Sequence, residues 1–324
     1  MNILEIKNLR TSFTTRQGKI YAVDDVSLDL PKGKITALVG ESGSGKSVTA
    51  MSVLRLIQAP GRVEGGRVLL HTQDGERDVL ALAEEQVRQT VRGTRIAMIF
   101  QEPMTSLNPV YTVGDQIMEA IALHQKVSGI QARALAVDLL ERVGIPNPES
   151  RIDNYPHEMS GGMRQRVMIA MGLSCEPELL IADEPTTALD VTIQAQILEL
   201  IKKLVDETGM SVLLITHDLG IVAAYATKVA VMYAGQIVEE ADTMSLFKSP
   251  KHPYTKGLLA SIPSLQGKAE KRLHAIPGMV PSLLDLPIGC RFQARCERKA
   301  PECGLGPIGL TQEGERQWRC VNTY

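Results

Sequence analysis

The chain has 324 residues, enough for about two domains, each with a hydrophobic core of its own. Hydrophobic residues make up 44% of it and charged residues 22%, which is typical of a globular protein and excludes a disordered one. With 35 Lys and Arg against 37 Asp and Glu, the net charge of -2 argues against a protein built chiefly to bind nucleic acid.

Membrane and targeting signals are weak throughout the sequence. Apolar runs such as those at 212–215 and 229–234 are far shorter than the roughly 18 residues that a membrane-spanning helix needs. The first residues mix Glu5 and Lys7 with apolar side chains, so they do not resemble a secretory signal. We therefore expect a cytosolic chain that does not itself cross a membrane.

Short apolar runs alternate with helical patterns, which is typical of an α/β protein with a largely parallel sheet. In chain order, segments within 2–30 and 62–80 alternate between apolar and polar residues and predict antiparallel strands. Residues 34–39 then predict a buried strand, and after a glycine-rich loop the apolar spacing predicts a helix over 47–58.

The middle of the chain, about 102–174, reads as an inserted helical subdomain, with periodic segments at 113–124 and 131–143. Beyond it, apolar strands at 178–182 and 211–216 flank a periodic helix over 192–208, which predicts a βαβ unit.

The texture of the sequence changes after about residue 240. Of the 17 prolines, 8 lie between Pro250 and Pro307, and regular periodicity fades. We therefore expect one domain over 1–240 and an irregular C-terminal extension over 241–324.

The strongest local signal is the glycine-rich loop, which fits the pattern G-x-x-x-x-G-K-[ST] between a strand and a helix. Its residues are Gly40, Glu41, Ser42, Gly43, Ser44, Gly45, Lys46 and Ser47. The glycines let backbone N–H groups turn inward, and the helix N-terminus adds partial positive charge, so the loop forms a cradle for phosphate. In such a cradle Lys46 would reach the β- and γ-phosphates, and Ser47 would ligate Mg²⁺.

Two carboxylates, Asp183 and Glu184, follow the predicted strand at 178–182. Asp183 can hold the metal through water, and Glu184 is placed to polarise a water for attack on the γ-phosphate. An Asp-Glu pair after a strand is by itself more often solvated surface. The phosphate loop in the same chain favours the catalytic interpretation.

Residues Ser160, Gly161 and Gly162 open another predicted helix. Together with the phosphate loop, Gln101, Asp183-Glu184, Asp190 and His217, in this order, they resemble the ABC-type ATPase cassette over about residues 1–240. The resemblance implies a P-loop ABC-type ATPase fold, with a RecA-like core, an antiparallel β subdomain and a helical subdomain, that binds and hydrolyses ATP with Mg²⁺.

By this resemblance, the helix end at Ser160, Gly161 and Gly162 caps the ATP that is bound to a partner cassette. The flanks depart from the usual Leu-Ser-Gly-Gly-Gln, because Met159 replaces Leu and Met163 replaces Gln. The Ser-Gly-Gly centre is intact, so we expect its function to be retained.

The resemblance also assigns roles to single residues. Gln101 would join the metal or the attacking water to the helical subdomain, and His217 would contact the γ-phosphate. Asp190 would help to couple the two composite sites. Phe13 would stack on adenine, with Tyr21 as the competitor, although either aromatic residue could instead belong to the core.

Two segments, 98–109 and 252–255, narrow the resemblance to the ATPase subunits of dipeptide, oligopeptide and nickel importers. The run Gly45-Lys46-Ser47-Val48 is similar to the first of two non-identical ATPase subunits. The implied partners are a second ABC ATPase subunit, two integral-membrane permeases that dock on the helical subdomain and, indirectly, an extracytoplasmic solute-binding protein. The implied location is the cytoplasmic face of a bacterial plasma membrane.

The function that follows is ATP hydrolysis that drives uptake of di- or oligopeptides, with nickel or another small solute as the alternative. A soluble ABC ATPase that clamps ribosomes or DNA is disfavoured, because the chain has one cassette and a compact insertion. A redox-sensing iron–sulfur protein with vestigial ATP binding is weakened by the full catalytic set.

Four cysteines, Cys290, Cys296, Cys303 and Cys320, crowd into the C-terminal extension, while Cys175 lies apart and suits a small buried residue. Clustered thiols in a reducing cytosol suggest a soft-metal site. Structural zinc usually has closely spaced cysteine pairs, so the wide spacing suits an iron–sulfur cluster better. Zinc and free thiols remain alternatives. The cysteines at corresponding places in the importer family look like ligands of a 4Fe-4S centre.

Overall fold

The computed structural model describes all residues except 73–74, 102–105, 188 and 263–274. The chain forms two compact units, each assembled from separate segments. The first unit contains Met1–Ile3, Pro31–Ile35 and Ala81–Ile215, and the second contains Leu4–Leu30, Thr36–Leu80 and Thr216–Tyr324. No described helix combines the length and the apolar character that spanning a bilayer requires.

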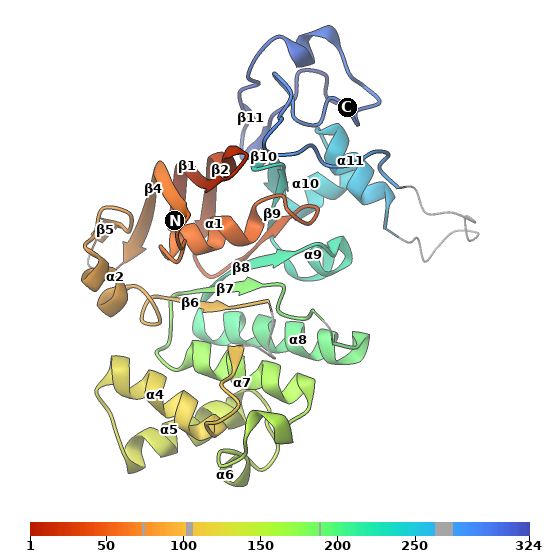
Figure 1. Cartoon of the computed structure of the whole chain (residues 1–324). Helices are drawn as coiled ribbons and strands as arrows, with labels where there is room; N and C mark the ends of the chain where they lie inside the picture. Colours follow the sequence, from red (N-terminus) through yellow and green to blue (C-terminus); the bar gives the residue numbers. More distant parts are fainter. Residues whose placement is uncertain (73–74, 102–105, 188, 263–274) are drawn as a thin grey trace, which may run out of the picture. The chain divides into compact units, whose positions relative to one another are not determined.

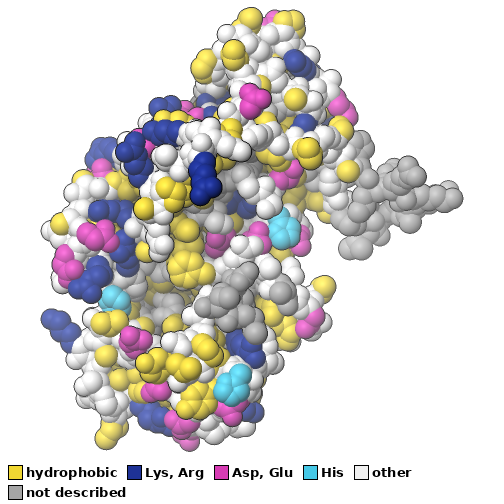
Figure 2. Space-filling model, in the orientation of Figure 1, with side chains coloured by type: hydrophobic (Ala, Val, Ile, Leu, Met, Phe, Trp, Pro, Cys, Tyr) yellow, Lys and Arg dark blue, Asp and Glu magenta, His cyan; other side chains and the backbone are white. Residues whose placement is uncertain are grey.

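The second unit contains an antiparallel sheet with the strand order β2-β1-β4-β5, as the alternation predicts. Its strands are β1 (Asn2–Thr15), β2 (Gly18–Pro31), β4 (Gly61–Thr72) and β5 (Gly75–Asp78). Ion pairs such as Lys19 with Glu64, 2.9 Å, and Arg67 with Asp78, 3.0 Å, lie along this sheet. Accordingly, Figure 2 shows side chains of both charges interspersed over this part of the molecule.

A second group of strands in this unit begins with the predicted strand β3 (Ile35–Val39), all of whose residues are buried. It runs parallel to β9 (Lys228–Tyr233), which pairs antiparallel with β10 (Gln236–Asp242). On its other side β10 pairs with β12 (Arg316–Trp318), and β11 (Thr311–Glu313) follows. The chain beyond residue 240 thus supplies strands to the same sheet as β3.

The helices of the second unit are α1 (Lys46–Val53), α9 (Leu219–Tyr225), α10 (Thr243–Lys248), α11 (Pro253–Ala260) and the 3₁₀ turn η2 (Pro301–Gly304). The sequence prediction of a helix over 47–58 was wrong at its C-terminal end. Arg55 has a left-handed backbone with φ 53°, and the Leu56 N–H donates to the Met51 carbonyl at 2.8 Å. This bond pattern closes a helix and prevents another turn.

The first unit is built on three parallel strands, β6 (Ile96–Ile99), β7 (Leu179–Asp183) and β8 (Ser211–Thr216). The register pairs Ile99 with Ala182 and Asp183 with Ile215. Helix α8 (Val191–Thr208) connects β7 to β8, so the predicted βαβ unit is present with bounds shifted by one residue at most.

The helices before β7 are α2 (Glu84–Thr90), α4 (Val113–Gln125), α5 (Ile130–Arg142), α6 (Pro148–Arg151), the 3₁₀ turn η1 (Pro156–Glu158) and α7 (Gly161–Leu173). Within the first unit, α4, α5 and α7 pack together, and α7 packs on α8 (Figure 1). Their shared core includes Ile117, Ile121 and Leu140, all fully buried. Part of the predicted subdomain, 102–105, lies outside the described residues, and so does part of the segment 98–109.

Candidate nucleotide-binding site

The phosphate loop, residues 40–47, lies in the second unit between β3 and α1. Lys46 is buried, and its Nζ donates to the carbonyl oxygens of Gly40 at 2.8 Å and Glu41 at 3.0 Å. The ammonium group therefore curls back over the loop. This is the position from which a cation can exchange carbonyl oxygens for phosphate oxygens.

Two glycines are required by the close approach of the loop to neighbouring backbone. A Cβ atom on Gly40 would lie 2.1 Å from the Met232 carbonyl oxygen, and one on Gly45 would lie 2.3 Å from that of Ala22. Both glycines also have positive φ, 153° and 105°. Side chains at these positions would push the loop off its support, so the glycine spacing of the motif has a direct physical cause.

The start of α1 supplies the electrostatics of an anion site. Gly45 is the N-cap, and the first turn carries no acidic residue that would neutralise the partial positive charge of the helix end. Ser47, the second residue of α1, is half-buried. Its hydroxyl group is a hard oxygen donor of the kind that Mg²⁺ prefers.

The other two predicted residues in this unit are Phe13 and His217. Phe13 pairs with Gly61 on β4 and is half-buried; a Cβ on Gly61 would lie 2.5 Å from the Phe13 ring. Tyr21, its competitor, lies on β2 with the Lys19 ammonium 5.1 Å from its ring centre. His217 is exposed and follows β8, and the next residue, Asp218, caps α9. Stacking of Phe13 or Tyr21 on adenine stays a prediction.

The first unit holds Glu184 in a defined position at the carboxyl end of β7. Its carboxylate accepts hydrogen bonds from Gln101 Nε2 and from Thr187 Oγ1, both at 2.9 Å, and its N–H donates to the Ile215 carbonyl at 2.9 Å. Its φ of 46° lies in the left-handed region, which costs a non-glycine residue about 1 kcal/mol or more. A strained backbone of this kind persists only where the surrounding contacts impose it. Here those contacts orient the Glu184 carboxylate.

The structure thus brings Gln101 and Glu184 together, while the roles of both residues in hydrolysis stay predictions. The neighbouring Asp183 is buried, with 4% exposure, at the end of β7. A carboxylate of this kind suits a hard cation or its bound water. Thr187, which also holds Glu184, was not among the predicted residues. A threonine three residues after an Asp-Glu pair is not a distinctive sequence signal.

The remaining predicted residues in this unit cap two helices. Ser160 is the N-cap of α7, where its Oγ accepts the Met163 N–H at 3.3 Å, and Gly161 and Gly162 are the first helical residues. Asp190 caps α8 and accepts the Ile193 N–H at 3.0 Å. The start of α7 is therefore an exposed helix N-terminus without acidic residues, which fits the predicted contact with an anion.

In the positions that the structure gives them, the cysteines of the C-terminal extension do not form the predicted metal site. Among the described residues, no group of three or more His, Cys, Asp and Glu side chains could hold a metal ion. Burial, followed by the charges of the other thiols in the extension, raises the pKa of Cys290 to about 11. Burial also raises the pKa of Cys296 and Cys320, so a metal that bound these thiols would have to displace their protons. The structure therefore does not support an iron–sulfur cluster or a zinc ion.

Cys175 also differs somewhat from its prediction. It is half-buried rather than buried, and desolvation raises the pKa of its thiol. Its sulfur lies 3.9 Å from the Ala120 carbonyl oxygen of α4. It behaves as a small packing residue between helices.

Two family descriptions match this chain. "ABC transporter" matches residues 23–187, and "Oligopeptide/dipeptide transporter, C-terminal region" matches residues 238–303. The second match includes α10, α11 and three of the four clustered cysteines.

Relatives of known name extend the similarity over nearly the whole chain. A "Putative peptide import ATP-binding protein" of Brucella ovis is 53% identical, and the alignment covers 98% of this chain and 96% of the relative. The "Oligopeptide transport ATP-binding protein AppD" of Bacillus subtilis is 50% identical, with the same coverage. The "Dipeptide transport ATP-binding protein DppD" of Escherichia coli is 49% identical, covering 99% of this chain and 96% of the relative.

Solved structures match the cassette. An ATP-binding cassette solved as a dimer in a post-hydrolysis state, bound to ADP and Pi, is 26% identical with a TM-score of 0.65. The match covers 74% of this chain and 98% of that one. CbiO1 of Clostridium perfringens, part of an ABC transporter complex, is also 26% identical, with a TM-score of 0.63 over 76% of this chain and 91% of that one. From its phosphate loop, its fold and these similarities, the chain belongs to the ABC transporter family, among the oligopeptide and dipeptide transport ATP-binding proteins.

Proposed function

We propose that this chain is the ATP-hydrolysing subunit of a bacterial importer of di- or oligopeptides. The observation that carries ATP hydrolysis is the Glu184 carboxylate, fixed by Gln101 and Thr187 at the end of β7 in a chain that also has a phosphate loop. Peptide as the solute is supported by the printed names of relatives that align over nearly the whole chain.

The residues would divide the work of phosphoryl transfer. Lys46 and the amides of residues 40–47 would hold the triphosphate, while Ser47, Asp183 and Gln101 would hold Mg²⁺. When bound, Mg²⁺ neutralises charge on the phosphate oxygens. Glu184 would take the proton of the attacking water as general base, and His217 would contact the γ-phosphate.

A second cassette, non-identical in our proposal, would complete each ATP site. Ser160, Gly161 and Gly162 would present the N-terminus of α7 to the nucleotide on that partner, and Asp190 would couple the two sites. ATP would then hold the closed pair together, because contacts to the γ-phosphate exist only before hydrolysis. This release on hydrolysis is what could drive transport.

Two permease subunits would bind the helices after Gln101, and a solute-binding protein outside the membrane would act through them. Exposed apolar side chains on this part of the first unit, Val110, Tyr111 and Leu123 among them, support a docking role. The chain would thus lie peripherally on the cytoplasmic face of the plasma membrane. We also propose that residues 1–240 form the cassette and 241–324 its extension.

We also propose that the four clustered cysteines hold a 4Fe-4S cluster or, alternatively, zinc. Thiol groups suit a soft metal such as iron or zinc. Metal and sulfide analysis of anaerobically purified protein, together with its visible absorbance, tests it. If the protein contains no iron, sulfide or zinc, the cysteines are free thiols and the proposed metal centre is refuted.

Reconstitution tests the main proposal. The chain is purified with its second ATPase and two permeases and reconstituted into liposomes. The cassettes face the lumen, and ATP is enclosed in the lumen. Peptide with its binding protein should raise ATP hydrolysis and be taken up. Stimulation by nickel and not by peptide would replace the solute, and absence of ATP hydrolysis under all conditions would refute the function.

A further inference from the structure

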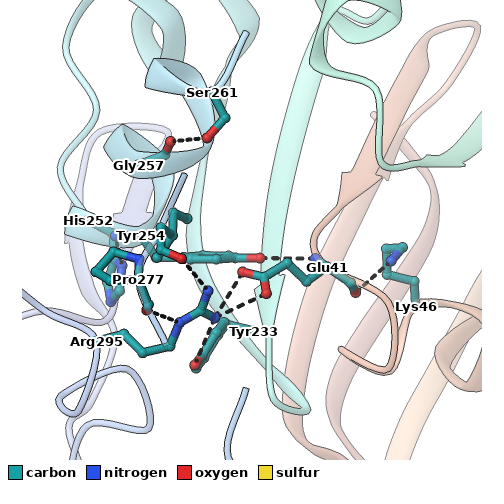
Figure 3. Close-up of polar contacts among 10 residues, drawn as sticks. Glu41, Lys46, Tyr233, His252, Tyr254, Gly257, Ser261, Pro277 and Arg295 are labelled. Atoms are coloured by element: carbon teal, nitrogen blue, oxygen red, sulfur yellow. Dashed lines mark hydrogen bonds and ion pairs between the residues drawn. The ribbon is translucent and has the colours of Figure 1, made fainter. Parts of the chain in front are cut away.

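Residue 41 of the phosphate loop is held by two residues from beyond residue 250. The backbone N–H of Glu41 donates to the hydroxyl of Tyr254 at 2.9 Å, and its carboxylate oxygens each lie 3.0 Å from Nη1 of Arg295. Figure 3 shows the Arg295 guanidinium and the Tyr254 hydroxyl pointing at Glu41, with Lys46 on its other side. All four residues belong to the second unit.

Arg295 is a buried and closely fitted side chain, 6% exposed. Its Nε donates to the Pro277 carbonyl at 3.0 Å, and its Nη2 donates to the Ile276 carbonyl at 3.4 Å. Its Cζ lies 5.8 Å from the ring centres of both Tyr233 and Phe292. Burial lowers the pKa of Arg295, but hydrogen bonds with Tyr233 and Glu41 outweigh it, so the pKa is raised and the group stays charged.

Tyr254 is equally fixed. It is fully buried at the start of α11, and its ring packs on Tyr233, 4.6 Å between centres, and on Phe292, 5.3 Å. Its own N–H donates to His252 Nδ1 at 3.0 Å. The Tyr254 hydroxyl, which accepts the hydrogen bond from the Glu41 N–H, is therefore positioned by the packing of its ring against Tyr233 and Phe292.

The negative charge of Glu41 explains why its contacts with Arg295 and Tyr254 matter. A carboxylate at the second position of a phosphate loop repels the triphosphate that the loop must bind. A guanidinium group within hydrogen-bonding distance cancels this charge and at the same time fixes the side chain. The Lys46 Nζ bond to the Glu41 carbonyl at 3.0 Å links the position of residue 41 to that of the phosphate-binding ammonium.

We infer that Arg295 is a positioning residue for nucleotide binding: it neutralises and fixes Glu41, Tyr254 fixes the backbone of the same residue, and the C-terminal extension thereby sets the affinity of the phosphate loop for MgATP. This inference rests on the proposed ATP-binding function and assigns part of it to a region outside the cassette.

The test is a charge-rescue cycle on the purified full chain, with the Kd for MgATP measured by calorimetric titration. Arg295→Met should raise the Kd about tenfold, because the Glu41 carboxylate is then uncompensated. Adding Glu41→Gln to this variant should recover most of the loss, and Arg295→Lys should lose less than Arg295→Met. A double variant that binds no better than Arg295→Met, or an Arg295→Met variant with the wild-type Kd, would overturn the inference.

Arg319 supplies the matched control. It is another buried arginine of the extension, and it donates to Asp25 Oδ2 at 3.2 Å and to the Ile308 carbonyl at 2.8 Å. Arg319→Met should leave the Kd for MgATP unchanged, whereas general loosening of the extension would raise it in both variants. Thermal unfolding of each variant checks folding. If Arg295→Met does not fold, Tyr254→Phe, which removes only the hydroxyl group, must still weaken MgATP binding.

The two levels of the proposal fail differently. A wild-type chain that does not bind MgATP contradicts the proposed function. A wild-type chain that binds it, with Arg295 variants that bind equally well, contradicts the positioning role alone.

Discussion

Gln101 Nε2 and Thr187 Oγ1 donate to the same oxygen of Glu184, Oε2, each at 2.9 Å. Two donors on one oxygen fix the plane of the carboxylate and so the direction in which the group can accept a proton. Gln101 follows β6 and Thr187 follows β7, so the orientation depends on two neighbouring strands of the first unit.

Glu184→Gln should abolish turnover without abolishing nucleotide binding. A positioned general base contributes about 10²- to 10⁴-fold, so phosphate release should fall by a factor of this order. MgATP should still bind, and the paired cassettes should stay associated in its presence. Phosphate release, MgATP titration and size-exclusion chromatography with the second ATPase measure these effects; near-normal hydrolysis would exclude Glu184 as the base.

Lys46→Ala should weaken binding itself. The substitution removes the cation of the cradle and the bonds from Nζ to the Gly40 and Glu41 carbonyls. A hydrogen bond to a charged group contributes about 1.5–3 kcal/mol, which corresponds to roughly a 10- to 150-fold rise in Kd for MgATP. Equilibrium titration decides; unchanged affinity would argue against the cradle.

Ser160→Ala separates the structural and the functional role of a helix cap. Loss of the bond to the Met163 N–H should cost about 1 kcal/mol of stability. Asp242→Ala is the control, since Asp242 caps α10 in the same way through the Ser245 N–H at 2.9 Å. Both variants should unfold earlier in urea, but only Ser160→Ala should lower ATP hydrolysis by the paired cassettes. Equal hydrolysis in the two would remove Ser160 from the site.

His252 predicts a pH dependence of stability. Burial lowers its pKa from the usual 6.5 to about 3. Below pH 6.5 His252 binds a proton in the unfolded chain but stays neutral in the folded chain. The contribution of His252 to the free energy of unfolding is therefore fully present above pH 6.5 and is lost as the pH falls toward 3. The loss approaches about 1.4 kcal/mol per pH unit within this window.

His252→Asn should remove this loss, because the Asn side chain can still accept the Tyr254 N–H and does not titrate. Urea midpoints measured between pH 7 and pH 4 should fall less steeply for this variant than for wild type. The exposed His157, changed to Asn, should give a wild-type slope. Parallel slopes for His252→Asn and wild type would contradict the assignment.

The elements that the sequence predicts well are those whose signal is local. Residues 211–216 and 192–208 have apolar patterns of the right period and length, and β8 and α8 match them within one residue. The phosphate loop was recognisable because glycine, lysine and serine occupy fixed spacings. The end of α1 was missed because it depends on the left-handed turn at Arg55, for which the sequence carries no glycine signal.

The contacts that could not be predicted join distant parts of the chain. Arg295 lies 254 residues after Glu41, and neither residue is unusual in its own segment. Tyr254 stood in a segment that carried a family resemblance, but its bond to the loop amide depends on how α11 packs against Tyr233. The four cysteines are a different case: their proximity along the chain suggests a metal site, but no group of three or more His, Cys, Asp and Glu side chains among the described residues is placed to hold a metal ion.

The pairing of β12 with β10 has a consequence for handling the protein. Without the hairpin of β11 and β12, β10 would be an edge strand with unpaired N–H and C=O groups, and the buried carboxylates Glu239 and Glu240 would lose their Arg316 and Gln317 partners. Bare edges of this kind pair with other chains. Truncation before Thr311 should therefore yield a protein that aggregates in a concentration-dependent manner, so the last fourteen residues protect its solubility.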